Sequence, residues 1–272
     1  MFDFSKAIQE AKQDLINDKL FLILLGSSGN GKSFAQGTFG VKTLYLYAQG
    51  ESHGPKSAAT LGGANIVPVC IDREGAKELS PDEAIARLIT ILDDVEGIEK
   101  AGFKAISIDG ASEIEALIRS TAKFKLTAKT SFEEGPATLA VFRQILNRLK
   151  KLQREAKVHV CLTCTLSVKE YGEDGAILES SPSLHGFQVA TGLIQQFDDV
   201  MVIGRMQRKD KVGYRLQLAA GVNKTTKDFT TKEVNKTYNF SPRLTGVDIL
   251  ELGATLDSDL AALIELKKKG RK

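Results

Sequence analysis

The sequence predicts an α/β protein with a mostly parallel central sheet, helices on both faces of that sheet, and antiparallel strands late in the chain. Short, continuously apolar runs, typical of strands buried on both faces, alternate with segments whose apolar residues recur at helical spacing. The 272 residues show no internal repeat and no interdomain linker, and this length suits one domain with a full core. Strands that alternate with helices favour parallel pairing.

The first elements follow from apolar spacing. Residues 4–18 are amphipathic and predict a helix, and residues 20–25 form a continuous apolar run that predicts a buried strand. Two further strands are expected at 43–47 and 66–71. The segment between them, 48–65, is rich in glycine and serine, and we interpret it as a loop.

The middle of the chain predicts longer helices. One helix is expected from Pro81 to about Lys100, because a proline at the first helical position precedes two acids. A buried strand is expected at 103–108 and a helix from about Ser112. Residues 127–135 are interpreted as a polar loop, after which Pro136 is expected to open a long helix.

The last part of the chain predicts strands at 158–166, 200–203 and 214–219, a hairpin or loop at 169–185 and a helix at 186–196. A short element is also expected near 247–250. The resulting organisation is an N-terminal helix (1–18), a core (19–253) and a C-terminal helix with a basic tail (254–272).

Cysteine usage and the lack of an export signal predict a cytoplasmic protein. The net charge is +3, and five of the last six residues are basic, so the remainder is slightly acidic and the tail is interpreted as solvated. We find no apolar run of membrane-spanning length and no apolar signal core after Asp3. Cys161 and Cys164 fall inside one predicted strand with their side chains on opposite faces, which favours buried thiols over a metal pair.

The strongest motif follows the first predicted strand and has the pattern Gly-x-x-x-x-Gly-Lys-Ser. Its glycines allow backbone N–H groups to surround phosphates at a helix N-terminus. In this pattern Lys32 reaches the β- and γ-phosphates, and Ser33 is a ligand of Mg²⁺. The motif predicts a site for ATP with Mg²⁺; the alternative is a glycine-rich turn that binds nothing. The expected nucleotide-binding residues are Gly26, Ser27, Ser28, Gly29, Asn30, Gly31, Lys32, Ser33 and Phe34.

A second motif is the apolar strand Ala105–Asp109, which ends in a carboxylate as a Walker B strand does. Asp109 is therefore predicted to hold Mg²⁺, directly or through a water, together with Ser33. The alternative role for Asp109 is to cap the helix that follows.

Four further stretches resemble segments of a known family: Ala48–Glu51, the strand at 158–165, Ser181–Gly186 and Phe197–Val200. Together with the two motifs above, they are similar to RecA-like P-loop ATPases encoded by bacteriophages. The resemblance is to the small recombination ATPases that act with a single-strand DNA-binding protein, and more distantly to RepA-type hexameric helicases. It covers roughly residues 20–230.

The resemblance implies roles for several residues. Glu51 would orient and deprotonate the attacking water, Thr163 or Thr165 would sense the γ-phosphate, and Lys224 and Lys227 would reach a neighbouring subunit's nucleotide. The simpler alternatives are an exposed loop acid, a buried hydroxyl and a solvated basic turn. The chain departs from the family in having Gly110 after Asp109, where serine or threonine is usual, and lysine where the late motif usually has arginine.

The function implied by the resemblance is ATP hydrolysis coupled to single-stranded DNA by a ring or filament of identical subunits. A single-strand DNA-binding protein is an implied partner, and the host cytoplasm is the implied location. Candidate DNA contacts are the predicted loops 127–135 and 169–185 with Lys123, Lys125, Lys129, Lys169 and Tyr171. The alternatives are a non-catalytic nucleotide-binding module and a P-loop kinase, for which the chain has few lid arginines.

Overall fold

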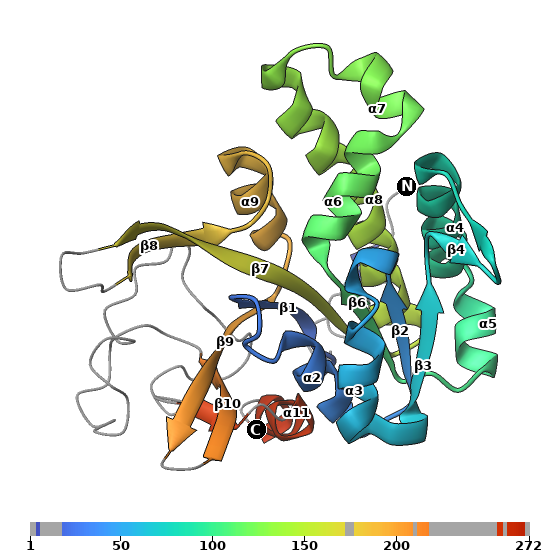
Figure 1. The fold of residues 1–272 in the computed structure, drawn as a ribbon. Helices are drawn as coiled ribbons and strands as arrows, with labels where there is room; N and C mark the ends of the chain where they lie inside the picture. Colours follow the sequence, from blue (N-terminus) through green and yellow to red (C-terminus); the bar gives the residue numbers. More distant parts are fainter. Residues whose placement is uncertain are drawn as a thin grey trace.

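The computed structural model describes residues 4–5, 18–171, 177–208, 211–217, 255–257 and 260–269. Its centre is a nine-stranded sheet in the order β11-β10-β9-β1-β7-β6-β2-β3, with β8 paired to β7. Helices cover both faces of the sheet (Figure 1). The predicted α/β class with a mostly parallel sheet is confirmed.

The parallel part of the sheet consists of β9 (Asp199–Arg208), β1 (Phe21–Gly26), β7 (His159–Tyr171), β6 (Ala105–Asp109), β2 (Thr43–Tyr47) and β3 (Ile66–Cys70). β1 lies between β7 and β9, and its residues from Phe21 to Leu25 are fully buried. A strand with neighbours on both edges and helices on both faces needs an unbroken apolar run, and the sequence supplies one.

The antiparallel strands come late in the chain, as expected. β9 (Asp199–Arg208) is parallel to β1, whereas β10 (Lys211–Gln217) and β11 (Thr255–Asp257) continue the sheet in antiparallel pairs. The expected hairpin at 169–185 is formed by β7 and β8 (Ile177–Pro182). A small separate hairpin joins Arg73–Glu74 (β4) to Lys77–Glu78 (β5).

The larger core lies on one face of the sheet. It is covered by α4 (Pro81–Asp93), α5 (Val95–Lys100), α6 (Ala111–Ser120), α8 (Ser131–Glu155) and α9 (Phe187–Ile194). From β1 this face receives Phe21, Ile23 and Leu25, and from β7 it receives Cys164. The Phe21 ring stacks on the ring of Phe197, with 4.9 Å between their centroids.

The smaller core lies on the opposite face, beneath α2 (Lys32–Gln36) and α11 (Leu260–Lys269). It receives the alternate β1 residues Leu22 and Leu24, and Cys161 from β7. The two cysteines of β7 are therefore buried on opposite faces, as the strand period predicts. The nine-residue α3 (Gly54–Gly62) lies farther along, against Tyr45 and Ile66.

The C-terminal helix is anchored by a buried ion pair. The ammonium of Lys267 lies 2.6 Å from Oδ2 of Asp199, at the start of β9, and donates to the backbone oxygen of Lys19 at 3.0 Å. The two side chains are 2% and 0% exposed. The prediction that the basic tail is solvated from Lys267 onward is therefore wrong for this residue.

Two predicted loops are helical. In 48–65, a 3₁₀ turn at Gln49–Glu51 and α3 replace the expected loop, because Pro55 occupies the first turn of α3 and Ala58 is buried against the sheet. In 127–135, α7 (Ala122–Thr127) is followed by only three residues before α8. Thr130 and Glu133 form a capping box, so α8 begins at Ser131 and Pro136 lies inside it.

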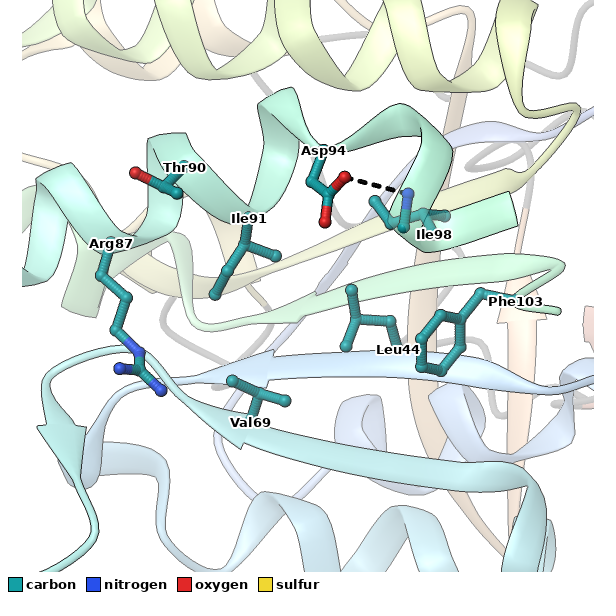
Figure 2. A pocket seen from close by; sticks show the side chains of 9 residues that line it. Leu44, Val69, Arg87, Thr90, Ile91, Asp94, Ile98 and Phe103 are labelled. Carbon is teal, nitrogen blue, oxygen red and sulfur yellow. Dashed lines mark hydrogen bonds between the residues drawn. The ribbon is translucent and has the colours of Figure 1, made fainter. Parts of the chain in front are cut away.

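The expected helix from Pro81 to Lys100 is divided into α4 and α5. Asp94 leaves helical geometry, with φ −84° and ψ 65°, and its carboxylate accepts the N–H of Gly97 at 2.9 Å (Figure 2). Most of the predicted N-terminal helix, the element near 247–250, and both Lys224 and Lys227 lie outside the described residues.

Within the described residues, β3 is one of the two edge strands in the order of the sheet, at the end opposite β11 (Figure 1). Pro68, at its centre, is aligned with Tyr45 of β2 and is exposed. Just beyond the strand, the N–H of Ile71 donates to the carbonyl of Tyr47 at 2.9 Å.

Candidate functional site

The Gly26–Ser33 loop joins the carboxyl end of β1 to the first turn of α2. Gly29 and Gly31 have φ of 76° and 82°, a region that residues with a side chain adopt at a cost. A Cβ at Gly26 would lie 2.7 Å from the Ile203 side chain and 2.8 Å from its carbonyl oxygen. The loop therefore has its shape because its glycines stand where a side chain would be strained or would collide.

Lys32 points back over this loop. Its ammonium donates to the carbonyl of Gly26 at 2.9 Å and to that of Ser27 at 3.2 Å. Burial lowers the pKa of Lys32, while the nearby carboxylate of Asp109 acts in the opposite direction. Two neutral carbonyls are weak partners for a buried ammonium, so this cation is well placed to receive an anion.

Asp109 is the carboxylate at the end of β6, and three hydroxyl groups donate to it. Ser33 donates to Oδ2 at 2.8 Å, Tyr45 also donates to Oδ2, and Thr163 donates to Oδ1 at 2.7 Å. Asp109 is 2% exposed. Its carboxylate is therefore fixed in direction by residues of β2 and β7 and of the helix that follows the loop.

Ser33 and Asp109 together fit a magnesium site. Mg²⁺ prefers oxygen ligands and is usually held by one or two carboxylates plus substrate phosphates, not by a cage made wholly of protein groups. The described residues contain no group of three or more His, Cys, Asp or Glu side chains that could hold a metal alone. A hydroxyl beside one oriented carboxylate is the donor set expected when phosphates supply further ligands.

Glu51 ends the 3₁₀ turn that follows β2. Asp72 orients this turn, because its carboxylate accepts the N–H of Gln49 at 3.0 and 3.1 Å. Burial raises the pKa of Glu51, and the carboxylates of Asp109 and Glu113 raise it further, against the smaller opposing effect of Lys32. A carboxylate with a raised pKa is suited to accept a proton near neutral pH.

The glycine after Asp109 has a local reason. Gly110 has φ of 92° and donates its N–H to the hydroxyl of Thr163 at 2.8 Å. A Cβ at this position would lie 3.0 Å from Cγ of Glu51. The departure from the usual serine or threonine is therefore linked to the place that Glu51 occupies.

These groups surround one cavity of about 280 Å³. Its lining combines five residues of the Gly26–Ser33 loop and Phe34 with Glu51, Ser57, Asp109 and Thr165. Loop residues, one lysine, a serine beside an aspartate and a further carboxylate residue thus line a common space. This arrangement suits a polyphosphate with a divalent cation.

Of the predicted site residues, the cavity is lined by Ser28, Gly29, Gly31, Lys32, Ser33, Phe34, Glu51 and Asp109, whereas Gly26, Ser27 and Asn30 belong to the loop without lining it. Thr163 is fully buried, with its hydroxyl bonded to Asp109 and to Gly110, whereas Thr165 lines the cavity. Lys224 and Lys227 lie outside the described residues. Sequence reasoning missed the roles of Tyr45, Gly54, Ser57, Asp72 and Glu113. The one available signal was Pro55, which marks a helix start beside the candidate base.

A second hollow, of about 480 Å³, lies between α4–α5 and strands β2–β3 (Figure 2). Leu44, Val69, Ile91 and Phe103 give it a mainly apolar lining. Such a surface offers little to a phosphate or a magnesium ion, so we do not assign the nucleotide to it.

No known protein family matches the chain, and no curated protein matches it either. Among the described residues, no helix combines the length and apolar character that crossing a bilayer requires. The functional argument therefore depends on the geometry of the site.

Proposed function

We propose that the protein binds ATP with Mg²⁺ in the cavity beside the Gly26–Ser33 loop and hydrolyses it. The observation that carries the proposal is the convergence of Lys32, the Ser33–Asp109 pair and Glu51 on that one cavity. Each is the residue type that phosphoryl transfer to water requires, and three separate segments of the chain bring them together.

Each residue has a distinct role in this proposal. The loop amides and Lys32 bind the β- and γ-phosphates, and Lys32 exchanges its two carbonyl partners for phosphate oxygens. Ser33 and Asp109 hold Mg²⁺, which neutralises charge on the phosphate oxygens when it is bound. Glu51 orients a water and accepts its proton. Thr165, which lines the cavity, is the proposed contact of the terminal phosphate.

The proposed class is a RecA-like P-loop ATPase that acts on single-stranded DNA in phage-type recombination or replication, as a ring or filament. The resemblance in sequence supports this class, as do the late antiparallel strands. Lys224 and Lys227 stay candidates for contact with a neighbouring subunit's nucleotide, and a single-strand DNA-binding protein stays a candidate partner.

One surface supports binding of a nucleic acid. Helices α7 and α8 project from the sheet (Figure 1) and expose Leu126 and Phe132, at 73% and 80%. Three exposed lysines, Lys123, Lys125 and Lys129, lie beside them. Exposed aromatic rings with neighbouring cations suit stacked bases and phosphates. Lys169 and Tyr171 are on β7, in the β7–β8 hairpin.

The test of the proposed activity is ATP hydrolysis with and without single-stranded DNA. Lys32→Ala is expected to abolish nucleotide binding, and Glu51→Gln to bind ATP while losing at least about a hundredfold in turnover. Lys56→Ala, an exposed lysine on α3, is the matched control and is expected to behave as the wild type. Binding of ATP by a wild type that never hydrolyses it would instead favour the non-catalytic module.

The DNA surface is tested separately by fluorescence anisotropy with a labelled oligonucleotide. Phe132→Ala is expected to weaken binding about tenfold or more, and Lys125→Glu with Lys129→Glu to weaken binding and reduce its salt dependence. Lys151→Glu, an exposed lysine farther along α8, is the control. Unchanged affinity in all these variants would remove this surface from the proposal.

A further inference from the structure

Tyr45 lies next to the proposed metal-binding carboxylate, although nothing in the sequence marks it as functional. It is fully buried on β2, and its hydroxyl donates to Oδ2 of Asp109, the same oxygen that accepts the hydroxyl of Ser33. A buried phenol ordinarily needs a partner, but a neutral acceptor would satisfy it. Here its partner is the carboxylate proposed to hold the metal.

The three hydroxyl donors to Asp109 differ in what else they serve. Ser33 is also a proposed metal ligand, and Thr163 holds Oδ1 while it accepts the N–H of Gly110. Tyr45 also contacts the hydroxyl of Ser33, and both hydroxyls donate to Oδ2. Tyr45 and Thr163 therefore fix the two carboxylate oxygens from neighbouring strands.

The first turn of α3 closes the space around this contact. A Cβ at Gly54 would lie 2.2 Å from Oδ2 of Asp109 and 2.7 Å from the Tyr45 hydroxyl. Glycine at this position lets the backbone lie directly against the pair. The close approach leaves the carboxylate little freedom to turn, and little space for an alternative donor on that side.

We propose that Tyr45 is a positioning residue of the metal site, whose hydroxyl holds Oδ2 of Asp109 in the direction from which Mg²⁺ is bound with the nucleotide phosphates. The inference rests on the proposed function and deepens it. Groups that orient a metal ligand through a hydrogen bond commonly change metal affinity by about 10- to 100-fold. The Tyr45 hydroxyl is expected to contribute at the lower end, because Thr163 also holds Asp109.

The test is calorimetric binding of ADP in EDTA and again in Mg²⁺. Tyr45→Phe is expected to leave the metal-free affinity unchanged and to remove about tenfold of the affinity gained with Mg²⁺. A merely structural role would weaken both affinities together. Tyr47→Phe is the matched control, since Tyr47 lies on the same strand with its ring 6.3 Å from that of Tyr45.

A double-mutant cycle with Asp109→Asn shows whether Tyr45 affects Mg²⁺ binding through Asp109. If Tyr45 acts through Asp109, the effect of Tyr45→Phe on the Mg²⁺ gain disappears when it is combined with Asp109→Asn. An undiminished Mg²⁺ gain in Tyr45→Phe, or an effect that persists without the carboxylate, overturns the inference. If the wild type binds ADP neither in EDTA nor in Mg²⁺, the proposed function is overturned instead. The failure of the inference about Tyr45 and the failure of the proposed function are therefore distinguishable.

A second measurement uses a protein that retains the Tyr45 hydroxyl, in case Tyr45→Phe does not fold. With 3-fluorotyrosine incorporated at position 45 alone, the ¹⁹F resonance is expected to shift when Mg²⁺ is added to the ADP complex. A resonance that does not respond to Mg²⁺ contradicts the proposed position of the hydroxyl beside the metal-binding carboxylate.

Discussion

Replacing Lys267 by methionine tests the buried ion pair that anchors the C-terminal helix. The change keeps a long apolar side chain but removes the cation 2.6 Å from Asp199. Asp199 is fully buried, and the N–H of Phe21 donates to the same Oδ2 at 2.9 Å. A buried carboxylate that loses its charge partner costs about 3–5 kcal/mol of folding free energy. We expect Lys267→Met to lower the melting temperature by roughly 10 °C.

Urea unfolding measures this effect as a lower midpoint at an unchanged m-value. Lys268→Met is the matched control: that lysine is exposed and pairs with Glu265 on its own helix, so no measurable change is expected. The double variant Asp199→Leu with Lys267→Met replaces both residues of the ion pair. It should recover much of the stability lost in Lys267→Met, because no buried charge remains at this place. An unchanged midpoint in Lys267→Met alone would refute the reasoning.

Four further predictions concern the site and the strand β7 beside it. Because the pKa of Glu51 is raised, its carboxylate should protonate at a higher pH than an ordinary glutamate, so turnover should begin to fall earlier on acidification. The same shift destabilises the folded state above the ordinary pKa, so Glu51→Gln should unfold at slightly higher urea concentration at pH 7. Gly110→Ala should cost about 1–2 kcal/mol of unfolding free energy and reduce turnover, because its φ is 92° and the new methyl group would meet Glu51. Burial lowers the pKa of His159 to about 3, so stability should decline from about pH 6.5 downward, by at most about 1.4 kcal/mol per pH unit.

Controls for these predictions are direct. The acid limb of the pH–rate profile should be absent in the residual activity of Glu51→Gln, and a persistent limb would assign the titration to another group. For His159, the unfolded chain binds the proton that the folded chain resists, so His159→Gln should remove the loss of stability between pH 6.5 and 5. The same loss in this variant would contradict the assignment.

The strands were predictable because each is specified locally. β1, β2 and β6 are short apolar runs that need no knowledge of their neighbours to be identified. The Gly26–Ser33 loop was predictable for the same reason, since the spacing of its glycines, lysine and serine is enough to predict the conformation of the turn. Asp109 followed from its place at the end of such a strand.

The elements that were missed depend on partners distant in sequence. A glycine- and serine-rich segment is a poor helix former, and α3 forms because its small residues fit against the sheet. Lys267 is ordinary in a run of lysines until Asp199 is brought beside it. Tyr45 is indistinguishable from Tyr47 in sequence. The pairing of β2 with β6 aligns Tyr47 with Asp109, yet it is the hydroxyl of Tyr45 that donates to the carboxylate.

Pro68 at the sheet edge has a consequence for assembly. In a parallel pair, alternate residues direct their peptide groups to the same neighbour, and Ile71 directs its N–H to Tyr47, so Val69 also faces β2 and Pro68 faces outward. The missing amide hydrogen thus falls where a foreign strand would seek a donor. Addition of a further strand is therefore disfavoured at the middle of β3, where the ladder would lack one hydrogen bond.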